Sequence, residues 1–420
     1  MTALEERLEA GTRERERATS AGIDRATWVG LSLVAFSAVI YWLCNRAYNA
    51  SRGDFFWLAD AFLHGRTWLD LRLGPWDVIV MDGRVYVPFG PFPAIAFMPL
   101  VALVGPLAAD QWESGINAAL AASAVGLCWM LMGRIGVERI RDRFALVALF
   151  GFGTMLWWVT TRGGVWHTGH LIAAILTLGC LVECFGRRRA FLIGLLAGAA
   201  FLTRAPLAFA LPFYALLIAS PAVSLRRFDR NFLDRLPIRE WLAMGAGFAI
   251  SIAFFLWYNN DRFGSPFESG YGLATLPPFL EAQRQRGLFS LSHVPMNLDY
   301  LFVHLPSFIP TVPFFKPDGL GMSVLLTSPG LLLALRAPWS DRRAWWLAGG
   351  GIAVLLPTLL YYGGGWLQFG YRYFLDSVPF VIALCGLAVA RAGRVTTAWS
   401  AAILWSVFVG ALSVYWAYHI

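Results

Sequence analysis

An acidic residue follows the first hydrophobic run of the chain directly and is the first candidate for chemistry. In the segment RGDFFWLADAFLHG, Asp54 shares a helical face with Trp57 and Leu58, whereas Asp60 points about 120° away and pairs with His64. A single carboxylate can act as a general base toward a hydroxyl group when the leaving group is already a good one. An acid at this position can also cap the N-terminus of an interfacial helix. Both interpretations of Asp54 stay open, and Asp60 is a candidate for substrate binding.

Two arginines lie in apolar stretches, where a charge is costly. Arg204 lies in AFLTRAPLAF, at the point where Pro206 breaks the helix. Arg372 lies in GGGWLQFGYRYFLDSVPF, at the end of a glycine-rich loop. A guanidinium at such a place either reaches lipid head groups or clamps a phosphate, which its fork of N–H donors fits well. Asp376 lies one turn after Arg372 and is the expected partner of that residue.

Four more polar residues are candidates for binding a substrate. His167 and His170, in GGVWHTGH, have the spacing of a metal pair, but no third ligand lies nearby in the sequence, which favours hydrogen bonding to a polar substrate or to head groups. Arg262 and Tyr271 lie in YNNDRFGSPFESGYG, which is either ordinary loop surface or the lining of an acceptor cleft. The sequence therefore predicts no metal site, and a divalent cation as cofactor stays an open alternative.

The composition indicates where these residues must lie. The chain is 58% hydrophobic and only 14% charged, which is too apolar for a soluble domain. Repeated apolar runs of about 17 to 23 residues match helices that cross a hydrocarbon core of about 30 Å. These runs predict an all-α, polytopic membrane protein. The net charge of +8 comes from arginines in short loops between the runs, which is typical of topology signals rather than of a nucleic-acid site.

Placing the arginine-rich loops in the cytoplasm gives one consistent path of about eleven spans. Residues 1–27 are then a cytoplasmic tail, and residues 28–420 form a single transmembrane domain whose C-terminus lies outside. The first external loop covers residues 45–111, and the longest external loop covers residues 259–320. The expected spans are residues 28–44, 112–132, 144–160, 171–185, 190–203, 205–220, 241–258, 322–335, 344–362, 373–390 and 395–418.

One further apolar run does not fit this path as a crossing. Residues 91–106, PFPAIAFMPLVALVGP, are long enough to be mistaken for a span, but counting them would invert every later arginine loop. We expect this run to form an external helix that lies in the membrane interface or re-enters the membrane. On the resulting path, the candidate polar residues gather at the external face.

Several of these segments together resemble the GT-C superfamily of polytopic glycosyltransferases, which includes protein O-mannosyltransferases and lipid A aminoarabinose transferases. The acid after the first span, followed by LADAFLHGRTWLD, resembles that family's first external loop, whose leading acid acts as a base. VYVPFGPFPAIAFMPLVALVG is similar to the helix that follows, and GLLAGAAFLTRAP to the segment that ends in a basic residue near the donor phosphate. RFGSPFESGYG and GYRYFLDSVPF look like segments of bacterial members. Many members have two adjacent acids where this chain has Asp54 and Phe55, so Asp54 lacks the usual neighbour.

The resemblance implies transfer of a sugar from a polyprenyl-phosphate carrier to a hydroxyl group of a glycan, lipid or protein acceptor. The reaction would take place on the external face of a bacterial inner membrane and would invert the anomeric carbon. Asp54 would be the catalytic base, and Arg204, together with Arg372, would bind the donor phosphate. A secondary transporter or lipid-carrier translocase is the alternative, because such proteins also have about a dozen spans and charges beside helix breaks.

Overall fold

The computed structural model describes residues 24–45, 53–70, 74, 76–219, 237–366 and 368–418, and over these residues the chain is mainly α-helical. Two short antiparallel strand pairs depart from the all-α fold that the sequence predicts. β1 (Ile79–Met81) pairs with β2 (Arg84–Tyr86), and β3 (Ser307–Phe308) pairs with β4 (Phe315–Lys316). Both pairs belong to the two long loops that were expected outside the membrane. Residues 1–23 of the expected cytoplasmic tail lie outside the described residues.

Six helices in the described part of the chain are long and apolar enough to cross a membrane. A helix of 20 residues is about 30 Å long, which matches the thickness of a hydrocarbon core. Their length and composition therefore support an integral membrane protein. The six are α2 (Arg25–Asn45), α6 (Glu113–Ile135), α9 (Val165–Cys184), α12 (Ile238–Phe263), α16 (Arg342–Leu360) and α18 (Thr397–Ala417).

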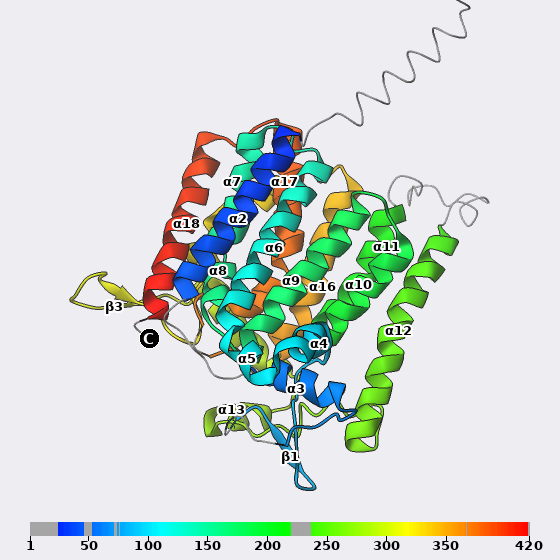
Figure 1. Ribbon diagram of the computed structural model, residues 1–420. Coiled ribbons are helices and arrows are strands. Elements are labelled where there is room, and N and C mark those ends of the chain that lie inside the picture. The colour runs from blue at the N-terminus through cyan, green and yellow to red at the C-terminus, as the bar shows by residue number, and fades with distance from the viewer. Residues whose placement is uncertain are drawn as a thin grey trace, which may run out of the picture.

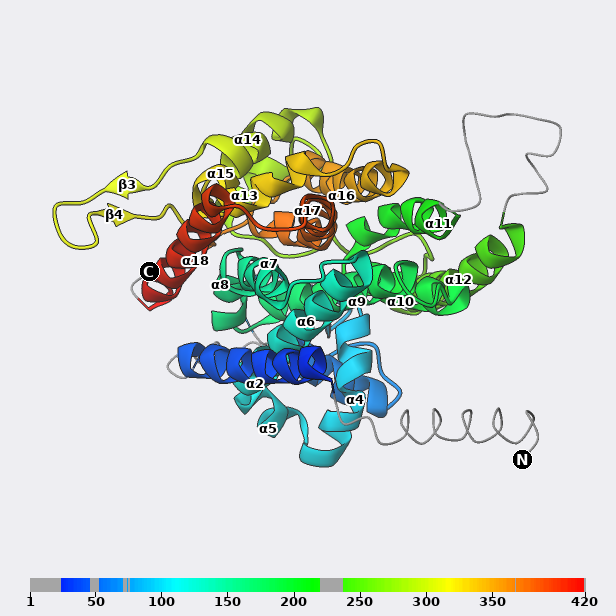
Figure 2. The same ribbon diagram turned by 90° about the horizontal axis from the view of Figure 1, so that it is seen from above.

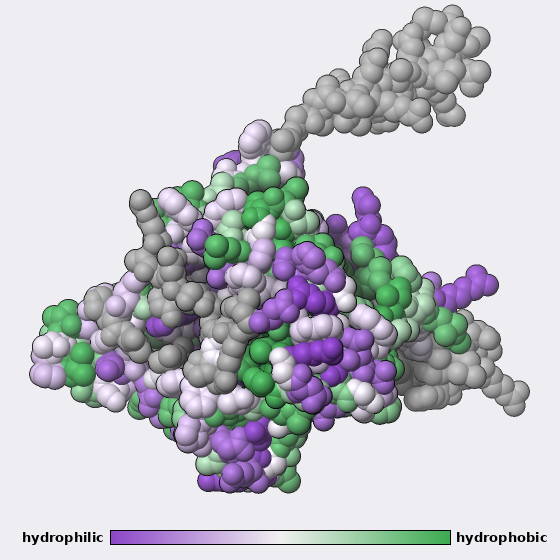
Figure 3. Space-filling view, turned by 60° about the horizontal axis from the view of Figure 1, so that its bottom comes forward, coloured by the Kyte–Doolittle hydropathy of each residue, from purple (hydrophilic) through white to green (hydrophobic). Residues whose placement is uncertain are grey.

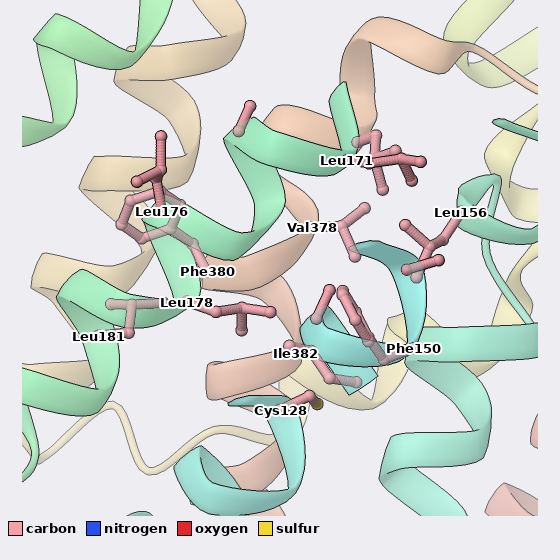
Figure 4. Close-up of a cluster of buried hydrophobic side chains, with 14 of the residues drawn as sticks. Cys128, Phe150, Leu156, Leu171, Leu176, Leu178, Leu181, Val378, Phe380 and Ile382 are labelled. Carbon is pink, nitrogen blue, oxygen red and sulfur yellow. The ribbon is translucent and has the colours of Figure 1, made fainter. Parts of the chain in front are cut away.

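The helices form one bundle with α9 at its centre (Figures 1 and 2). Within the apolar segment of each helix, 83% of the residues are buried in α9, compared with 22% in α2 and in α12. Leu171 and Leu178 of α9 lie in the core close to Val378 and Phe380 of α17 (Val378–Ala392), as Figure 4 shows. The outer helices keep an exposed apolar surface, as helices that face lipid do.

Four expected spans are shorter than predicted or broken. Residues 144–160 are divided between α7 (Ile140–Phe152) and α8 (Leu156–Thr161), where the Thr154 hydroxyl donates to the Phe150 carbonyl at 2.7 Å and accepts from the Leu156 N–H at 3.2 Å. The other three breaks begin beside a proline, which cannot donate a backbone hydrogen bond. They separate η1 (Ala205–Ala210) from α11 (Leu211–Ala219), α15 (Val324–Thr327) from η5 (Pro329–Arg336), and η6 (Arg372–Asp376) from α17. By contrast, α10 (Ala190–Thr203) has the predicted bounds.

The segments between α2 and α6 gather at one end of the bundle, which we call the α3 end (Figure 1). There, α3 (Asp54–Leu63) contacts both α4 (Phe92–Val104) and α5 (Pro106–Gln111). The apolar run of residues 91–106 is thus divided at Gly105, whose φ of +80° suits a glycine. α4 has 13 residues and is about 20 Å long, which is less than a hydrocarbon core requires and agrees with a helix that does not cross.

The long loop of residues 259–320 covers the same end. It contributes α13 (Pro278–Arg284), η3 (Leu291–His293), α14 (Val294–Leu298) and η4 (Asp299–Val303). Its Thr275 exchanges backbone hydrogen bonds with the first loop, accepting from Asp77 at 2.7 Å and donating to Val78 at 2.9 Å. Figure 3, in which this end is turned toward the reader, shows hydrophilic residues gathered over part of the face beside hydrophobic ones.

Helices α10 and α12 approach each other through glycines. A β-carbon added to Gly194 of α10 would stand 2.0 Å from the Met244 carbonyl oxygen, and one added to Gly247 of α12 would stand 2.4 Å from the Phe191 carbonyl oxygen. Small residues allow such close backbone contact between membrane helices. The contact holds the end of α10, and therefore Arg204, beside the long loop that follows α12.

We expect Gly247→Ala to destabilise the protein by about 1–3 kcal/mol, because the added methyl group overlaps the backbone of α10. Gly245→Ala on the same helix is the matched control, since nothing lies within 4 Å of its β-carbon position. The measurement is the thermal midpoint of each variant in detergent. Equal midpoints for the two variants would contradict the close approach of α10 and α12.

Candidate functional site

A pocket of about 120 Å³ opens at the α3 end, beside Arg204. Arg204 follows the last residue of α10 in extended backbone, with φ −147° and ψ 110°, and Pro206 then lies in the first turn of η1. The break that the sequence predicts at Arg204 is therefore present. The pocket is lined by Phe89, Arg204, Ala205, Pro206, Tyr271, Phe289, Pro357, Thr358, Tyr361 and Tyr373.

A buried carboxylate holds Arg204 in place. The Arg204 Nε–H donates to Asp376 Oδ2 at 2.6 Å, and the other oxygen of Asp376 lies 3.0 Å from Nδ1 of His170. The side chains of Asp376 and His170 are 0% exposed, and that of Arg204 is 18% exposed. The sequence expected Asp376 to pair with Arg372, one turn away, and this was wrong: the partner is 172 residues distant.

Arg372 contacts the same tyrosine ring as Arg204, but it does not line the pocket and is held differently. Both guanidinium groups lie 5.4 Å from the centre of the Tyr373 ring. Arg372 donates to the Trp366 carbonyl at 3.3 Å, and among the described residues no carboxylate forms an ion pair with it, although its side chain is buried. A buried cation that lacks a counter-ion is costly, so this position favours an anionic ligand.

Three tyrosines form much of the wall around Arg204. Burial raises the pKa of the Tyr271 phenol, although Arg204 lowers it, and the net shift is upward. Tyr271 therefore stays neutral at physiological pH and keeps an O–H group that can both donate and accept. The ring of Tyr361 lies across from those of Tyr271 and Tyr373, at centroid distances of 6.4 and 6.5 Å. This arrangement offers aromatic faces and hydroxyl groups to a ligand whose anionic group contacts Arg204.

The two histidines of α9 face different partners. His170 supports Asp376, whereas the Nδ1 atom of His167 lies 3.1 Å from the Gly163 carbonyl oxygen. The Nε2 atoms of both residues are buried without a partner among the described residues. No group of three or more His, Cys, Asp or Glu side chains in the described part of the chain is arranged to hold a metal ion.

Asp54 is the first residue of α3, and its side chain is buried. Gly53 occupies the N-cap position and Asp54 lies in the first turn of α3, where a carboxylate also interacts favourably with the helix N-terminus. Both interpretations of Asp54 therefore stay open. Asp54 interacts electrostatically with Glu113 at the start of α6, and Asp110 of α5 lies against Gly53. No acidic residue is adjacent to Asp54 in the sequence, but in the fold Glu113 and Asp110 lie near it.

Glu113 connects this acidic group to α9. Its Oε1 atom accepts hydrogen bonds from the Gly164 N–H at 2.8 Å and from the Thr168 hydroxyl at 3.0 Å. The ring of Phe55, next to Asp54, lies 4.0 Å from the β-carbon position of Gly169. Residues next to Asp54 and residues next to Arg204 therefore contact the same end of α9. Asp54 itself does not line the pocket around Arg204.

Two other candidates lie apart from the pocket. Asp60 is half-buried and lies 3.7 Å from Nδ1 of His64, the pairing that the sequence predicts. Arg262 is buried, donates to the Val87 carbonyl at 3.1 Å and to Asn259 Oδ1 at 2.9 Å, and thereby ties α12 to the loop that carries Phe89. These contacts make Arg262 a support for the loop beside the pocket, and its role in substrate binding stays a prediction.

Sequence reasoning missed Glu113, Tyr361 and Tyr373. An acid at the outer edge of the second expected span was a usable signal for Glu113, because charges at such positions are costly unless they have a partner. No comparable signal marked the tyrosines among the many aromatic residues of the chain. Comparison of the chain with protein-family models, with curated proteins and with solved structures finds no match.

We expect Asp376→Asn to lower the stability by about 3–5 kcal/mol, because it removes the buried carboxylate that compensates the half-buried Arg204 charge. Glu281→Gln is the matched control: it removes an ion pair with Arg284 that is partly exposed, for which we expect a loss of about 0–1 kcal/mol. Thermal unfolding in detergent measures both. Similar losses for the two variants would be incompatible with a buried ion pair between Arg204 and Asp376.

Proposed function

We propose that this protein is an integral membrane glycosyltransferase that transfers a sugar from a polyprenyl-phosphate donor to an acceptor hydroxyl group. The observation that carries the proposal is the pocket around Arg204, in which a guanidinium oriented by buried Asp376 meets aromatic and phenolic walls. A phosphate group suits the guanidinium, a sugar suits the tyrosines, and a prenyl chain suits the apolar surfaces of the neighbouring helices.

The charges around the pocket support an anionic donor. Two guanidinium groups, those of Arg204 and Arg372, share the ring of Tyr373, whereas only one carboxylate, that of Asp376, neutralises them among the described residues. The remaining positive charge can stabilise the phosphate in the donor and as it leaves. Preorganised donors directed at developing negative charge contribute a few kcal/mol to catalysis.

In this proposal, Asp54 acts on the acceptor. The acceptor oxygen attacks the anomeric carbon of the sugar, the bond from that carbon to the phosphate oxygen breaks, and its electron pair leaves with the phosphate. The proton of the acceptor hydroxyl passes to the Asp54 carboxylate. A single displacement of this kind inverts the anomeric carbon. His167 and His170 lie between the two regions on α9, where His170 orients Asp376 and thereby Arg204.

The proposal includes a membrane topology with about eleven crossings and a cytoplasmic N-terminus. The α3 end, with the two long loops, then lies outside, and the membrane is the inner membrane of a bacterium. Six long apolar helices and the shorter apolar helices α10, α17 and η1 with α11 would account for nine of these crossings. The broken segments α7 with α8 and α15 with η5 would account for the other two. The acceptor, which is a glycan, lipid or protein, would approach from the α3 end.

A lipid-carrier translocase or secondary transporter is the second candidate. The observation that favours it is the position of Arg204 at the break between α10 and η1, because transporters bind charged substrates at interrupted helices. The two candidate functions differ in what happens to the lipid-linked sugar. A translocase binds and moves the carrier without cleaving the bond between the sugar and the phosphate.

Arg204→Gln should weaken binding of a polyprenyl-phosphate-linked sugar by about tenfold to a hundredfold, because a charge-assisted hydrogen bond contributes roughly 1.5–3 kcal/mol. Arg204→Lys keeps the charge opposite Asp376 and should retain the fold while losing part of the affinity. The exposed Arg239, in the first turn of α12, provides the control Arg239→Gln. Binding of a radiolabelled donor to purified protein is the measurement, and unchanged affinity in both Arg204 variants would exclude a phosphate contact.

Asp54→Asn should lower the rate of sugar transfer by about a hundredfold to ten-thousandfold, because it removes the general base, while donor affinity stays the same. Glu240→Gln, at an exposed acid in the first turn of α12, is the control and should transfer at the normal rate. The assay follows labelled sugar from the donor to a panel of hydroxyl acceptors, and NMR of the product reports inversion. Transfer by Asp54→Asn at the rate of the unsubstituted protein would refute the role of Asp54. Carrier binding without any sugar transfer would favour the translocase.

A further inference from the structure

A hairpin of residues 303–317 leaves the bundle between η4 and α15. Its strands β3 and β4 pair Ser307 with Lys316 and Phe308 with Phe315. Figures 1 and 2 both show it projecting sideways beyond the helices, on the side of α18 and near the level at which that helix ends. The β1–β2 hairpin, by contrast, extends away from the α3 end along the direction of the helices (Figure 1).

The 303–317 hairpin exposes large apolar side chains. Phe308 is 92% exposed, the highest value for a large hydrophobic residue in the described part of the chain. In the same hairpin, Val312 is 74% exposed and Leu305 is 65% exposed. Between Asp299 and Asp318 the chain has no acidic residue. Exposed apolar surface of this kind marks a contact with a partner or a membrane rather than a water-facing loop.

The base of the hairpin is polar and fixed. His304 bridges its two sides, with Nδ1 2.9 Å from Asp299 Oδ2 and Nε2 3.0 Å from Asp318 Oδ2. The His304 carbonyl accepts the Ser323 N–H at 2.8 Å, which attaches the base to the segment that precedes α15. The charged groups therefore stay at the bundle, and the apolar tip is held away from it.

Two features favour lipid over a second copy of the chain as the partner of this tip. Pro306, Pro310 and Pro313 remove backbone donors, so the short strands present a poor edge for pairing with another strand. The hairpin also lies beside α18, whose exposed Trp405 and Phe408 belong to the apolar outer surface of the bundle. Segments that lie in a membrane interface bury Phe and Leu side chains at the boundary between head groups and acyl chains, and a lysine there reaches the head groups.

We propose that the 303–317 hairpin is an interfacial membrane anchor. Phe308, Val312 and Phe314 lie among the acyl chains of the leaflet at the α3 end, and Lys316 contacts lipid phosphates. The hairpin adds a lateral contact with the bilayer that does not depend on the spanning helices. This inference does not rest on the proposed glycosyl transfer.

The test places an environment-sensitive fluorophore on the tip, in Phe308→Cys, with the protein in proteoliposomes of phosphatidylcholine and phosphatidylglycerol. Val80→Cys on the β1–β2 hairpin is the matched control, because Val80 is 53% exposed on a hairpin that points along the bundle. The five native cysteines are buried or half-buried, and the unsubstituted protein serves as the labelling blank. Lipids that carry a nitroxide quencher on the acyl chain should quench the label at position 308 several-fold more strongly than the label at position 80.

Equal quenching at the two positions would place the tip in water and overturn the proposal. Energy transfer between labels on separate copies, without quenching by lipid, would also overturn it and would identify a second copy as the partner. Val312→Cys provides an independent label position on the same tip and should give the same result as Phe308→Cys. Replacing Phe308 by serine should reduce the quenching of the label at position 312.

Discussion

A half-buried positive charge at a helix break, paired with a fully buried carboxylate, is the constraint on which the α3 end of the bundle depends. Moving an ion out of water costs several kcal/mol unless a partner and hydrogen bonds compensate it. Arg204 meets that condition only when three elements pack together: the end of α10, η6 with the carboxylate of Asp376, and α9 with His170. The ion pair therefore fixes the relative positions of the elements that carry the pocket.

The same constraint explains the irregular helices around the pocket. A continuous helix through Arg204 would direct its N–H groups and carbonyl groups along the helix axis, whereas the break at Pro206 turns the backbone there. The short helix η6 carries Asp376 and Arg372 on a tight turn that follows the glycine-rich loop. Both guanidinium groups thus reach the ring of Tyr373 from different segments. Regular spans would pack more simply but would not bring these groups together.

The sequence predicted the structure correctly where a residue type determines the conformation of its own segment. Apolar runs located the six long helices, Pro206 located the break at Arg204, and helical spacing separated Asp54 from Asp60. It failed where the outcome depends on contacts across the bundle. Asp376 lies four residues from Arg372, and local spacing favoured that pairing, but η6 is too tight a turn to behave as an α-helix and directs the carboxylate to Arg204. Glu113 joined Asp54 for the same reason, because only the fold brings α6 and α3 together.

Acidic and basic residues both gather around the N-terminal part of α9, which bears on the proposed chemistry. Asp54 lies with Glu113 and near Asp110, while Arg204 and Arg372 lie on the side of Tyr373. In the proposed reaction, the first group would accept the proton of the acceptor hydroxyl and the second would stabilise the leaving phosphate. The N-terminal part of α9 supports both regions, through Thr168 on the acidic side and His170 on the basic side. The deep burial of α9 in the bundle restricts the movement of the groups attached to it, and a fixed geometry of this kind favours catalysis by proximity and orientation.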